Sequence, residues 1–392
     1  MDTLHQVRVA VIGCGGIGSA HVRCIASGGV EGMQLAAICD IDPNKRAFAA
    51  QQYPGVRVEA DFHALLDGTI DAVIIAVPHP MHCAIAAECL RGGLHVLTEK
   101  PVDVSVTAAE KAVQAAKESG RIFAMMLNQR TAPIFQRARE IVQSGALGQL
   151  KRTVWIITNW YRTQHYYDSG AWRATWKGEG GGVLLNQAPH NLDLWQWICG
   201  MPVSVSAYCD VARYHRIEVE DDATLLTRYE NGATGLFVTS TGEYPGTNRL
   251  EIAGDRGKLV LEEGTLKRWQ LEAAESDVRW QSEEGMPHIP FTYTEEHFED
   301  GGPQHQGILQ NFANALRHGE ALISPAEDGL NELMLSNAAY LSQWTGNAPV
   351  ALPVDGAAFD ALLAEKAANS MTHEALAKLP AGEYQERWQT RW

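Results

Sequence analysis

The glycines of the segment Gly13-Cys-Gly-Gly-Ile-Gly18 have the spacing of a phosphate-binding turn, because they follow an apolar strand and begin an apolar helix. In this G-x-G-x-x-G pattern the first glycine makes a tight turn, the second lets a diphosphate approach the backbone, and the third packs the helix against the strand. The diphosphate would bind the free N–H groups at the helix N-terminus. The pattern predicts a dinucleotide site formed by Gly13, Gly15, Gly16, Ile17 and Gly18.

Asp40 ends the second predicted strand, about 20 residues beyond the glycines. A carboxylate at this place accepts hydrogen bonds from both hydroxyls of an adenosine ribose and repels a 2′-phosphate. Asp40, with Ile41 beside it, therefore favours NAD over NADP as the cofactor. The competing interpretation is a glycine turn in a different α/β protein, with Asp40 capping a helix.

Lys100 and His190 are the residues best suited to proton transfer. Lys100 follows a predicted buried strand and precedes Pro101, and burial beside a positively charged nicotinamide would lower the pKa of its ammonium group. The alternative for Lys100 is a solvated surface lysine. An imidazole group titrates near neutrality, and His190 follows Asn186 by four residues, so both would lie on one face of a helix predicted near Asn186 to Ile198. The alternative for His190 is a purely structural histidine.

A loop from residue 159 to 182, and the strand before it, are rich in aromatic side chains interleaved with Arg162, His165 and Arg173. Flat rings flanked by hydrogen-bond donors suit a pyranose, which offers a face for stacking and hydroxyls for hydrogen bonds. Aromatic rings also form cores and subunit interfaces, and we expect about half of these to do so. The rings belong to Trp155, Trp160, Tyr161, Tyr166, Tyr167, Trp172 and Trp176.

The elements that would position these residues alternate between strand and helix from Val7 to about Asn128, as in a doubly wound parallel sheet of the Rossmann type. From Gln129 several strands follow one another without intervening helices, which predicts an α+β domain with a large, mostly antiparallel open sheet. A hairpin is expected at residues 254–257. We expect the helices at 306–317 and 331–344 to pack back towards the first domain, and the acidic segment 264–302 to be irregular.

The chain is therefore predicted to have three parts. These are an NAD-binding Rossmann domain at residues 1–128, a substrate-binding and oligomerisation domain at 129–365, and a C-terminal extension at 366–392. The end of that extension, Tyr384–Trp392, is expected either to dock on a neighbouring subunit or to hang free.

Composition excludes several classes of protein. The 392 residues include 32 basic and 47 acidic ones, and the resulting charge of −15 argues against nucleic acid or an anionic membrane as a partner. No apolar run approaches the roughly 18 residues of a membrane helix, and the first strand begins too early to follow a signal peptide. The seven cysteines are scattered without a C-x-x-C pair, which favours reduced thiols in a cytoplasmic protein and no metal site.

Together these motifs resemble those of the Gfo/Idh/MocA oxidoreductases, and the resemblance covers the chain to about residue 355. Members of that family pair a Rossmann domain with a C-terminal α/β domain whose open sheet often makes dimers or tetramers. Most oxidise or reduce one secondary alcohol of a sugar or cyclic polyol. The resemblance rests on the glycine turn, Asp40, Pro78-x-x-x-His82, Glu99-Lys100-Pro101, Trp172-Arg173 and the segment from Gly180 to Asp193.

The resemblance implies roles for individual residues. Lys100 would exchange the proton, and the bond between Lys100 and Pro101 would be cis. Family members usually carry an aspartate where this chain has Asn186, and because an amide cannot accept a proton, Asn186 is expected to position the substrate while His190 shares the acid–base work. Asp193 would either fix the tautomer of His190 or cap its helix.

The remaining site residues follow from their places in the loops. His79 and His82 have the spacing of a metal pair, but without a third ligand we expect them to line the nicotinamide ribose. The further cofactor-binding set is Pro78, His79, His82, Glu99, Lys100, Asn128, Trp172 and Arg173. The substrate-binding set is Lys100, Arg130, Tyr161, His165, Arg173, Asn186 and His190.

The sequence thus predicts an NAD-dependent dehydrogenase of a secondary ring hydroxyl. The more specific prediction is a glycoside or related pyranose oxidised at C3, with inositol as the second choice. A glycosidase that uses bound NAD transiently would instead release free sugar without net NADH. A non-catalytic sensor on the same fold, as in the yeast galactose repressor, is the third alternative, which the Asn186 substitution leaves open.

Overall fold

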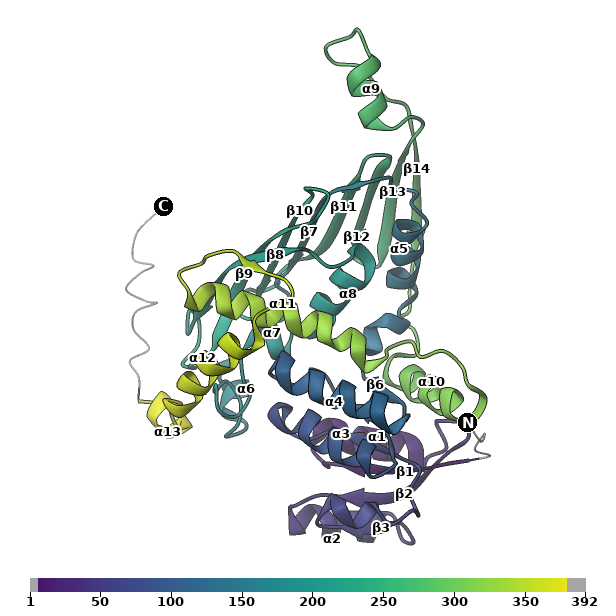
Figure 1. Cartoon of the computed structure of the whole chain (residues 1–392), viewed down its shortest axis with the longest axis vertical. Helices are drawn as coiled ribbons and strands as arrows, with labels where there is room; N and C mark the ends of the chain where they lie inside the picture. Colours follow the sequence, from purple (N-terminus) through teal and green to yellow (C-terminus); the bar gives the residue numbers. More distant parts are fainter. Residues whose placement is uncertain (1–5, 379–392) are drawn as a thin grey trace. The chain divides into compact units, whose positions relative to one another are not determined.

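The computed structural model describes residues 6–378, which form two compact units (Figure 1). The first unit combines the chain up to Thr131 with Gly302–Leu333, and the second combines Ala132–Gly301 with the chain from Met334 onward. In the described part of the chain, no helix has the length and apolar character needed to cross a membrane. The tail predicted at 384–392 lies outside the described residues.

The first unit is built on a six-stranded sheet in which all neighbouring strands are parallel. The strand order, β3-β2-β1-β4-β5-β6, is that of the dinucleotide-binding doubly wound fold, with its switch point between β1 and β4. The predicted Rossmann sheet is confirmed. The strands are β1 (Val7–Ile12), β2 (Met33–Cys39), β3 (Arg57–Glu59), β4 (Ala72–Ile75), β5 (His95–Thr98) and β6 (Phe123–Met125).

Helices connect these strands, and their ends follow ordinary capping rules. The helix α2, for example, begins after Asp42, whose carboxylate accepts the N–H of Asn44, and Pro43 occupies the first helical position. The α-helices are α1 (Gly16–Ala26), α2 (Pro43–Gln52), α3 (His82–Arg91) and α4 (Val106–Ser119). Short 3-10 helices span Phe62–Leu65, His79–Met81 and Asn128–Thr131.

The segment 302–333 completes the core of the first unit. Its helix α10 (Gln304–His318) places Ile308, Leu309 and Phe312 in one buried cluster with Val9 of β1. Helix α10 therefore packs back onto the first unit as predicted. The Rossmann domain predicted as the continuous stretch 1–128 does not contain this segment, because the segment lies some 170 residues beyond Thr131 in sequence.

Arg130 holds the returning segment in place. Its side chain is completely buried, and Nη1 donates to Oδ2 of Asp328 at 2.6 Å and to the carbonyl oxygen of Ile323 at 3.1 Å. A guanidinium group buried among these acceptors is not available to a substrate. The prediction that Arg130 binds substrate is therefore corrected to a structural role inside the first unit.

The second unit contains a nine-stranded sheet in the order β14-β13-β12-β11-β7-β10-β9-β8-β15. Only β10 and β7 run parallel, so the predicted mostly antiparallel sheet is confirmed, and the predicted hairpin joins Gly254 to Gly257. The strands are β7 (Leu150–Ile157), β8 (Ser204–Val211), β9 (Glu220–Arg228), β10 (Thr234–Ser240), β11 (Asn248–Gly254), β12 (Gly257–Glu262), β13 (Thr265–Leu271), β14 (Phe291–His297) and β15 (Val350–Ala351).

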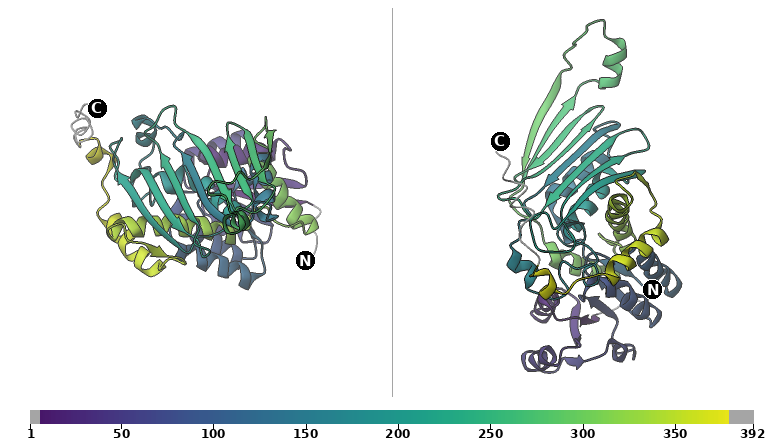
Figure 2. Two further views of the ribbon diagram at one scale, coloured as in Figure 1. Left: turned by 90° about the horizontal axis from the view of Figure 1, so that it is seen from above. Right: turned by 90° about the vertical axis from the view of Figure 1, so that its left-hand side faces the viewer.

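One face of this sheet is covered by helices (Figures 1 and 2). The core beneath them includes Trp155, Trp195 and Phe237, all with side chains less than 2% exposed. The helices of this unit are α5 (Pro133–Gln143), α6 (Gln164–Asp168), α7 (Val183–Asn186), α8 (Pro189–Cys199), α9 (Glu275–Gln281), α12 (Gly356–Ala368) and α13 (His373–Leu376). Helix α11 (Ala326–Trp344) contributes residues to both units.

Two sequence-based predictions in the second unit differ from the structure. The segment 264–302, expected to be irregular, forms β13, α9 and β14, and this hairpin extends beyond the neighbouring strands (Figure 1). The helix expected near Asn186 to Ile198 is present as α8 but begins three residues later, at Pro189, and Asn186 ends the separate short helix α7. Proline has no N–H to continue the helical hydrogen bonds, so the chain breaks there.

Candidate active site

The glycine turn of the first unit has the shape that a diphosphate requires. Gly13 has φ +92°, and a Cβ atom there would lie 2.5 Å from the carbonyl oxygen of Ala76. A Cβ atom on Gly18 would lie 1.8 Å from the carbonyl oxygen of Gly13, so both positions require glycine. Beside Gly15 and Gly16, by contrast, a Cβ atom would meet open space at the start of α1. The backbone thus fits a dinucleotide phosphate.

Asp40 connects the glycine turn to the end of β2. Its Oδ2 accepts the N–H of Cys14 at 2.7 Å, and its Oδ1 accepts the N–H of Asp42 at 2.8 Å. The ammonium group of Lys45 lies 3.4 Å from Oδ2. Ile41, the next residue, is 84% exposed and offers an apolar surface beside this carboxylate. The arrangement fits the ribose and adenine of NAD.

His82 joins two loops at the carboxyl ends of β4 and β5. Its Nδ1 lies 2.8 Å from the carbonyl oxygen of Pro101, and its Nε2 lies 2.8 Å from that of Val77. The ring is buried, and the ring of His79 lies next to it with the centroids 5.9 Å apart. His82 thus positions the loops that carry Pro78 and Lys100, and both of its ring nitrogens face carbonyl oxygens rather than a metal site.

A buried network surrounds the Glu99-Lys100-Pro101 segment. Oε1 of Glu99 lies 2.7 Å from Nε2 of His21, a residue of α1, and the ring of His305 from α10 lies 5.9 Å from that of His21. Burial opposes ionisation of Glu99, but its hydrogen bond with His21 and its electrostatic interactions with His21, His305 and Lys100 lower its pKa overall. The bond between Lys100 and Pro101 is cis, as predicted.

Neither His21 nor His305 was predicted from the sequence as a site residue. His21 follows Gly18 by three residues on an apolar helix, where nothing in the local pattern indicates a carboxylate partner. His305 belongs to the returning segment, and its proximity depends on the fold rather than on spacing. Asn128, which was predicted, donates from Nδ2 to Oε1 of Gln304 at 2.6 Å, and its buried Oδ1 has no hydrogen-bond partner in the described part of the chain.

In the second unit, Asn186 and His190 are partly exposed to solvent, whereas their neighbours in the chain are buried. From Glu179 to Gln196 every residue is buried apart from these two, which are partly exposed. The argument that both lie on one face of a continuous helix is wrong, since the chain breaks between α7 and α8. Asp193, which was expected to fix His190 or cap the helix, accepts a hydrogen bond from Gln196 at 3.1 Å.

Two buried glutamates hold the segment that carries Asn186. Glu220 of β9 accepts the N–H groups of Gly182 and Leu184, both at 2.9 Å, and the hydroxyl of Tyr340 at 2.7 Å. Burial raises the pKa of Glu220 to about 7, although these hydrogen bonds favour its charged form. Glu179 accepts a hydrogen bond from Nδ2 of Asn186.

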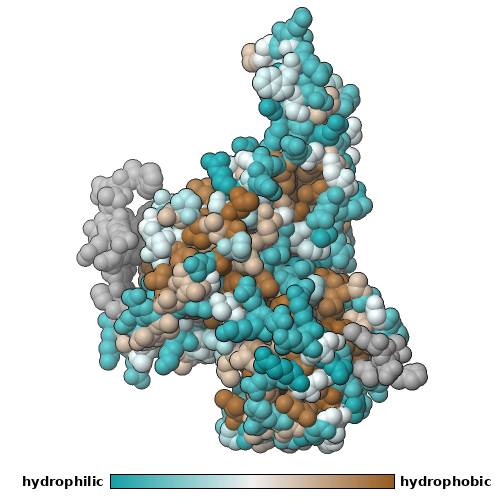
Figure 3. Space-filling model, viewed as in Figure 1, coloured by the Kyte–Doolittle hydropathy of each residue, from teal (hydrophilic) through white to brown (hydrophobic). Residues whose placement is uncertain are grey.

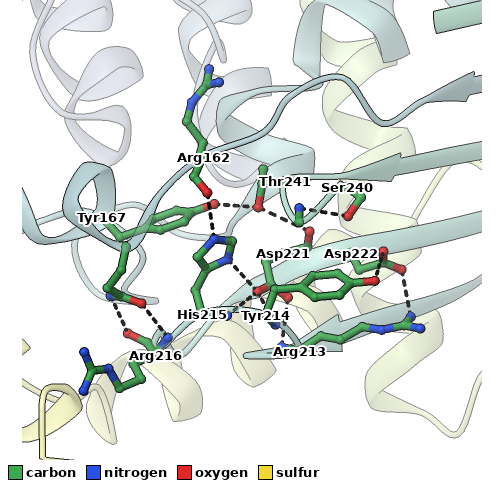
Figure 4. Close-up of polar contacts among 12 residues, drawn as sticks. Arg162, Tyr167, Arg213, Tyr214, His215, Arg216, Asp221, Asp222, Ser240 and Thr241 are labelled. Atoms are coloured by element: carbon green, nitrogen blue, oxygen red, sulfur yellow. Dashed lines mark hydrogen bonds and ion pairs between the residues drawn. The ribbon is translucent and has the colours of Figure 1, made fainter. Parts of the chain in front are cut away.

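A third buried acid, Asp221, shapes the aromatic loop (Figure 4). Its Oδ atoms accept the N–H groups of Arg213, Tyr214 and His215 at 2.8–2.9 Å, and Oδ2 lies 2.9 Å from Nδ1 of His215. On the other side of the same ring, Nε2 lies 2.9 Å from the carbonyl oxygen of Arg162. His215 therefore fixes the start of the aromatic loop against β9.

The aromatic side chains divide between core and surface. Trp155, Tyr167 and Trp176 are buried, whereas Trp160, Tyr166 and Trp172 are partly exposed. The remaining two predicted contacts, Tyr161 and His165, are exposed. The hydroxyl of Tyr166 accepts a hydrogen bond from Arg173 at 2.8 Å, and the guanidinium group of Arg173 also lies 4.5 Å from the ring centres of Tyr166 and Trp172.

Comparison with known proteins defines the class. A model described as an oxidoreductase family with an NAD-binding Rossmann fold matches residues 7–127, which makes the chain an NAD-binding oxidoreductase. The C-terminal domain model of the same family matches residues 135–260. The chain belongs to the Gfo/Idh/MocA family, and the resemblance noted in the sequence is confirmed.

Full-length relatives support this assignment. Inositol 2-dehydrogenase 2 of Saccharopolyspora erythraea is 27% identical over 367 residues, which cover 91% of this chain and 99% of the relative. The scyllo-inositol 2-dehydrogenase (NAD(+)) of Bacillus subtilis is 26% identical, with 89% and 97% covered. The WlbA dehydrogenase of Bordetella pertussis, solved with NADH and UDP-GlcNAcA, is 27% identical with a TM-score of 0.74, covering 89% of this chain and 100% of that one.

Replacing Asp40 by asparagine should weaken the preference for NAD⁺ over NADP⁺. Hydrogen bonds to a charged group contribute about 1.5–3 kcal/mol, so kcat/KM for NAD⁺ should fall about 10- to 150-fold while that for NADP⁺ falls less or rises. Steady-state kinetics with both cofactors measures the ratio. The control is Asp42→Asn, which keeps a helix-capping side chain in the same loop. An unchanged ratio in Asp40→Asn would contradict the role of Asp40.

Replacing Glu220 by glutamine should change how stability depends on pH. Because the folded protein raises the pKa of Glu220 from 4.5 to about 7, its proton is bound more tightly in the folded state. The resulting stabilisation is present below about pH 4.5 and is lost as the pH rises to about 7. The melting temperature of the wild type relative to Glu220→Gln should therefore decline across this window. A difference that stays constant with pH would refute the raised pKa.

Proposed function

We propose that the protein oxidises a secondary ring hydroxyl of a glycoside or related pyranose, at C3, to a ketone. The hydroxyl gives its proton to a side chain of the protein and its carbon gives a hydride to NAD⁺, so the products are the ketone, NADH and a proton. Bound NAD⁺ supplies the hydride acceptor. The first unit would hold it through the glycine turn, Asp40 and the loops that carry Pro78 and Glu99.

The proton is proposed to move through Lys100 and His190. Lys100 lies just after the carboxyl end of β5 beside a buried glutamate, where an amine can exchange a proton with a reacting hydroxyl. His190 offers an imidazole on a partly exposed position. Asn186 would bind a substrate hydroxyl without exchanging a proton, and Tyr161, His165, Trp172 and Arg173 of the second unit would contact the ring or the cofactor.

The observation that carries this proposal is the exposure pattern of residues 179–196, where only Asn186 and His190 reach the surface. A segment that serves only the core would have no reason to expose an amide and an imidazole together. Aromatic rings and an arginine, Tyr166, Trp172 and Arg173, belong to the preceding loop of the same unit. Such a combination of stacking surface and hydrogen-bond groups suits a polyhydroxylated ring.

An inositol ring is the second candidate substrate. It is favoured by the names of the full-length relatives, which include several inositol 2-dehydrogenases. The chemistry at the reacting carbon would be the same, since inositol also presents a secondary ring hydroxyl. A panel of substrates distinguishes the two, because a pyranoside and an inositol differ in the ring oxygen and in the substituent at the anomeric carbon.

Turnover of NAD⁺ with a panel of pyranoses, methyl glycosides and inositols should produce NADH, measured by absorbance, with one class of ring. Lys100→Met should lower kcat about 10²- to 10⁴-fold, as expected for loss of an acid–base group, while NADH still binds. The control Lys111→Met removes an exposed lysine from α4 and should keep full activity.

Other outcomes of this panel would contradict the proposal. Free sugar released from a glycoside without net NADH would indicate the redox-assisted glycosidase. Binding of NADH and of a sugar without turnover in either direction would indicate a sensor. Activity retained in Lys100→Met would remove Lys100 from the mechanism.

We also propose that two or four copies associate through the open face of the second unit's sheet. Along β8 and β9 the side chains alternate, so that Ala207 and Leu225 are buried while Tyr208 and Leu226 are more than half exposed on the other face. Figure 3 shows the opposite side of this unit, which carries the helices and on which apolar residues are interspersed with polar ones. An exposed sheet face that carries such large apolar side chains among polar ones is suited to pairing with a second copy.

Replacing Leu226 by glutamate should weaken this association, because it places a charge in the middle of an apolar contact. Size-exclusion chromatography with light scattering should give the mass of an oligomer for the wild type and of a smaller species for Leu226→Glu. The matched control is Phe48→Glu, at an exposed position on α2 of the first unit, which should leave the mass unchanged. A wild type that elutes as a monomer would overturn this part of the proposal.

A further inference from the structure

Glu179 is a buried carboxylate that connects two parts of the candidate substrate-binding surface in the second unit. Its side chain is 1% exposed, and its two oxygens have different partners. Oε1 accepts a hydrogen bond from Nδ2 of Asn186, and Oε2 accepts the N–H of Ala174 at 2.5 Å. A single carboxylate thus contacts both the end of α7 and the turn that follows Arg173.

The turn at Ala174 needs this acceptor. Ala174 has φ +52°, a left-handed conformation that is unfavourable for alanine, and it is completely buried. A buried N–H without an acceptor is costly, and Glu179 supplies one. The residue before this turn, Arg173, donates to the hydroxyl of Tyr166, so the position of the turn determines the position of that guanidinium group.

The contact with Asn186 fixes the orientation of its amide. An ionised carboxylate only accepts hydrogen bonds, so it selects the rotamer in which the amide nitrogen faces Glu179. The amide oxygen then lies on the opposite side of the amide group. Asn186 is one of only two partly exposed residues between Glu179 and Gln196, and with its nitrogen bonded to Glu179 its amide would offer the oxygen as the acceptor for a bound molecule.

We propose that Glu179 is a positioning residue for substrate recognition. By holding the amide nitrogen of Asn186, it makes Asn186 a hydrogen-bond acceptor for a substrate hydroxyl. Through its bond to Ala174 it also fixes the position of the turn after Arg173 relative to that acceptor. This inference rests on the proposed function, since it names the atom that recognises the ring hydroxyl. The phenol of Tyr167 is the ionisable neighbour that senses the charge of Glu179, although burial is the main cause of its raised pKa.

Exchanging the acid and the amide across this hydrogen bond tests the proposal. Glu179→Gln places an amide opposite an amide, which forces Asn186 to turn its oxygen inwards. NADH binding should be unchanged, while KM for the ring substrate rises about 10-fold or more and kcat falls less, because an acceptor has been replaced by a donor. Asn186→Asp places two carboxylates against each other and should lower the melting temperature.

The double variant E179Q/N186D restores one acid and one amide in the reverse order. The introduced amide can donate to the introduced carboxylate, whose second oxygen again faces outward as an acceptor. KM should return to within about three-fold of the wild type, and the melting temperature should recover relative to Asn186→Asp. The control Ala174→Gly, combined with Glu179→Gln, relieves the strained turn without touching Asn186 and should not restore KM.

The outcomes separate this inference from the proposed function. It is overturned if Glu179→Gln changes KM less than about two-fold, if the double variant behaves no better than the worse single variant, or if Ala174→Gly alone rescues Glu179→Gln. The melting temperatures test the exchange whatever the wild type oxidises. A wild type that oxidises none of the rings, with the recovery in the double variant intact, would overturn the proposed function and leave the Glu179–Asn186 contact supported.

Discussion

Buried carboxylates that accept backbone N–H groups determine the shape of the loops in both units. An ionised acid inside a protein is costly unless its oxygens are hydrogen-bonded, and a loop whose N–H groups point inward is costly unless it finds acceptors. In this protein the buried carboxylates accept hydrogen bonds from the inward-pointing N–H groups, so both costs are avoided. The acids, all less than 10% exposed, are Asp40, Glu99, Glu179, Glu220 and Asp221.

The same acids account for the close approach of backbone segments around the candidate site. The N–H of Gly182 donates to the carboxylate of Glu220, and a Cβ atom on Gly182 would lie 1.9 Å from the carbonyl oxygen of that same glutamate. Asp40 likewise draws the N–H of Cys14 towards the end of β2 and so holds the glycine turn closed. In both places the residue beside the acid must be small or must donate from its backbone, and this constrains the sequence as strongly as any contact with a ligand.

Much of the first unit could be predicted because its signals are local. A glycine turn between an apolar strand and a helix, followed by Asp40, indicates a dinucleotide-binding fold, and all of these signals lie within some 35 consecutive residues. The return of α10 could not be predicted in detail, since it is the long-range packing of Phe312 and the burial of Arg130 that place it there. The hairpin of β13 and β14 was missed because β13 is mostly half-buried and β14 largely exposed, and neither keeps an apolar–polar alternation along its whole length.

The candidate site was predictable in its residue types but not in its supporting contacts. Asn186 and His190 have a recognisable sequence pattern around them. The contact of His21 with Glu99 and that of His215 with Asp221 depend instead on the fold of each unit. Residues that bind or react must be of particular chemical types, which a sequence displays. Residues that position them need only be complementary to a neighbour, and the identity of that neighbour depends on tertiary structure.

The break between α7 and α8 explains why the supporting acids matter. In a continuous helix the backbone would fix Asn186 relative to His190, but a helix of four residues is too short to be stable by its own hydrogen bonds. Its first N–H groups are held by Glu220, and the side chain at its last residue is held by Glu179. Two buried glutamates therefore replace the missing helical continuity. Because side-chain contacts can be exchanged more easily than a helix can be rebuilt, this construction lets the amide at 186 be oriented independently of the imidazole at 190.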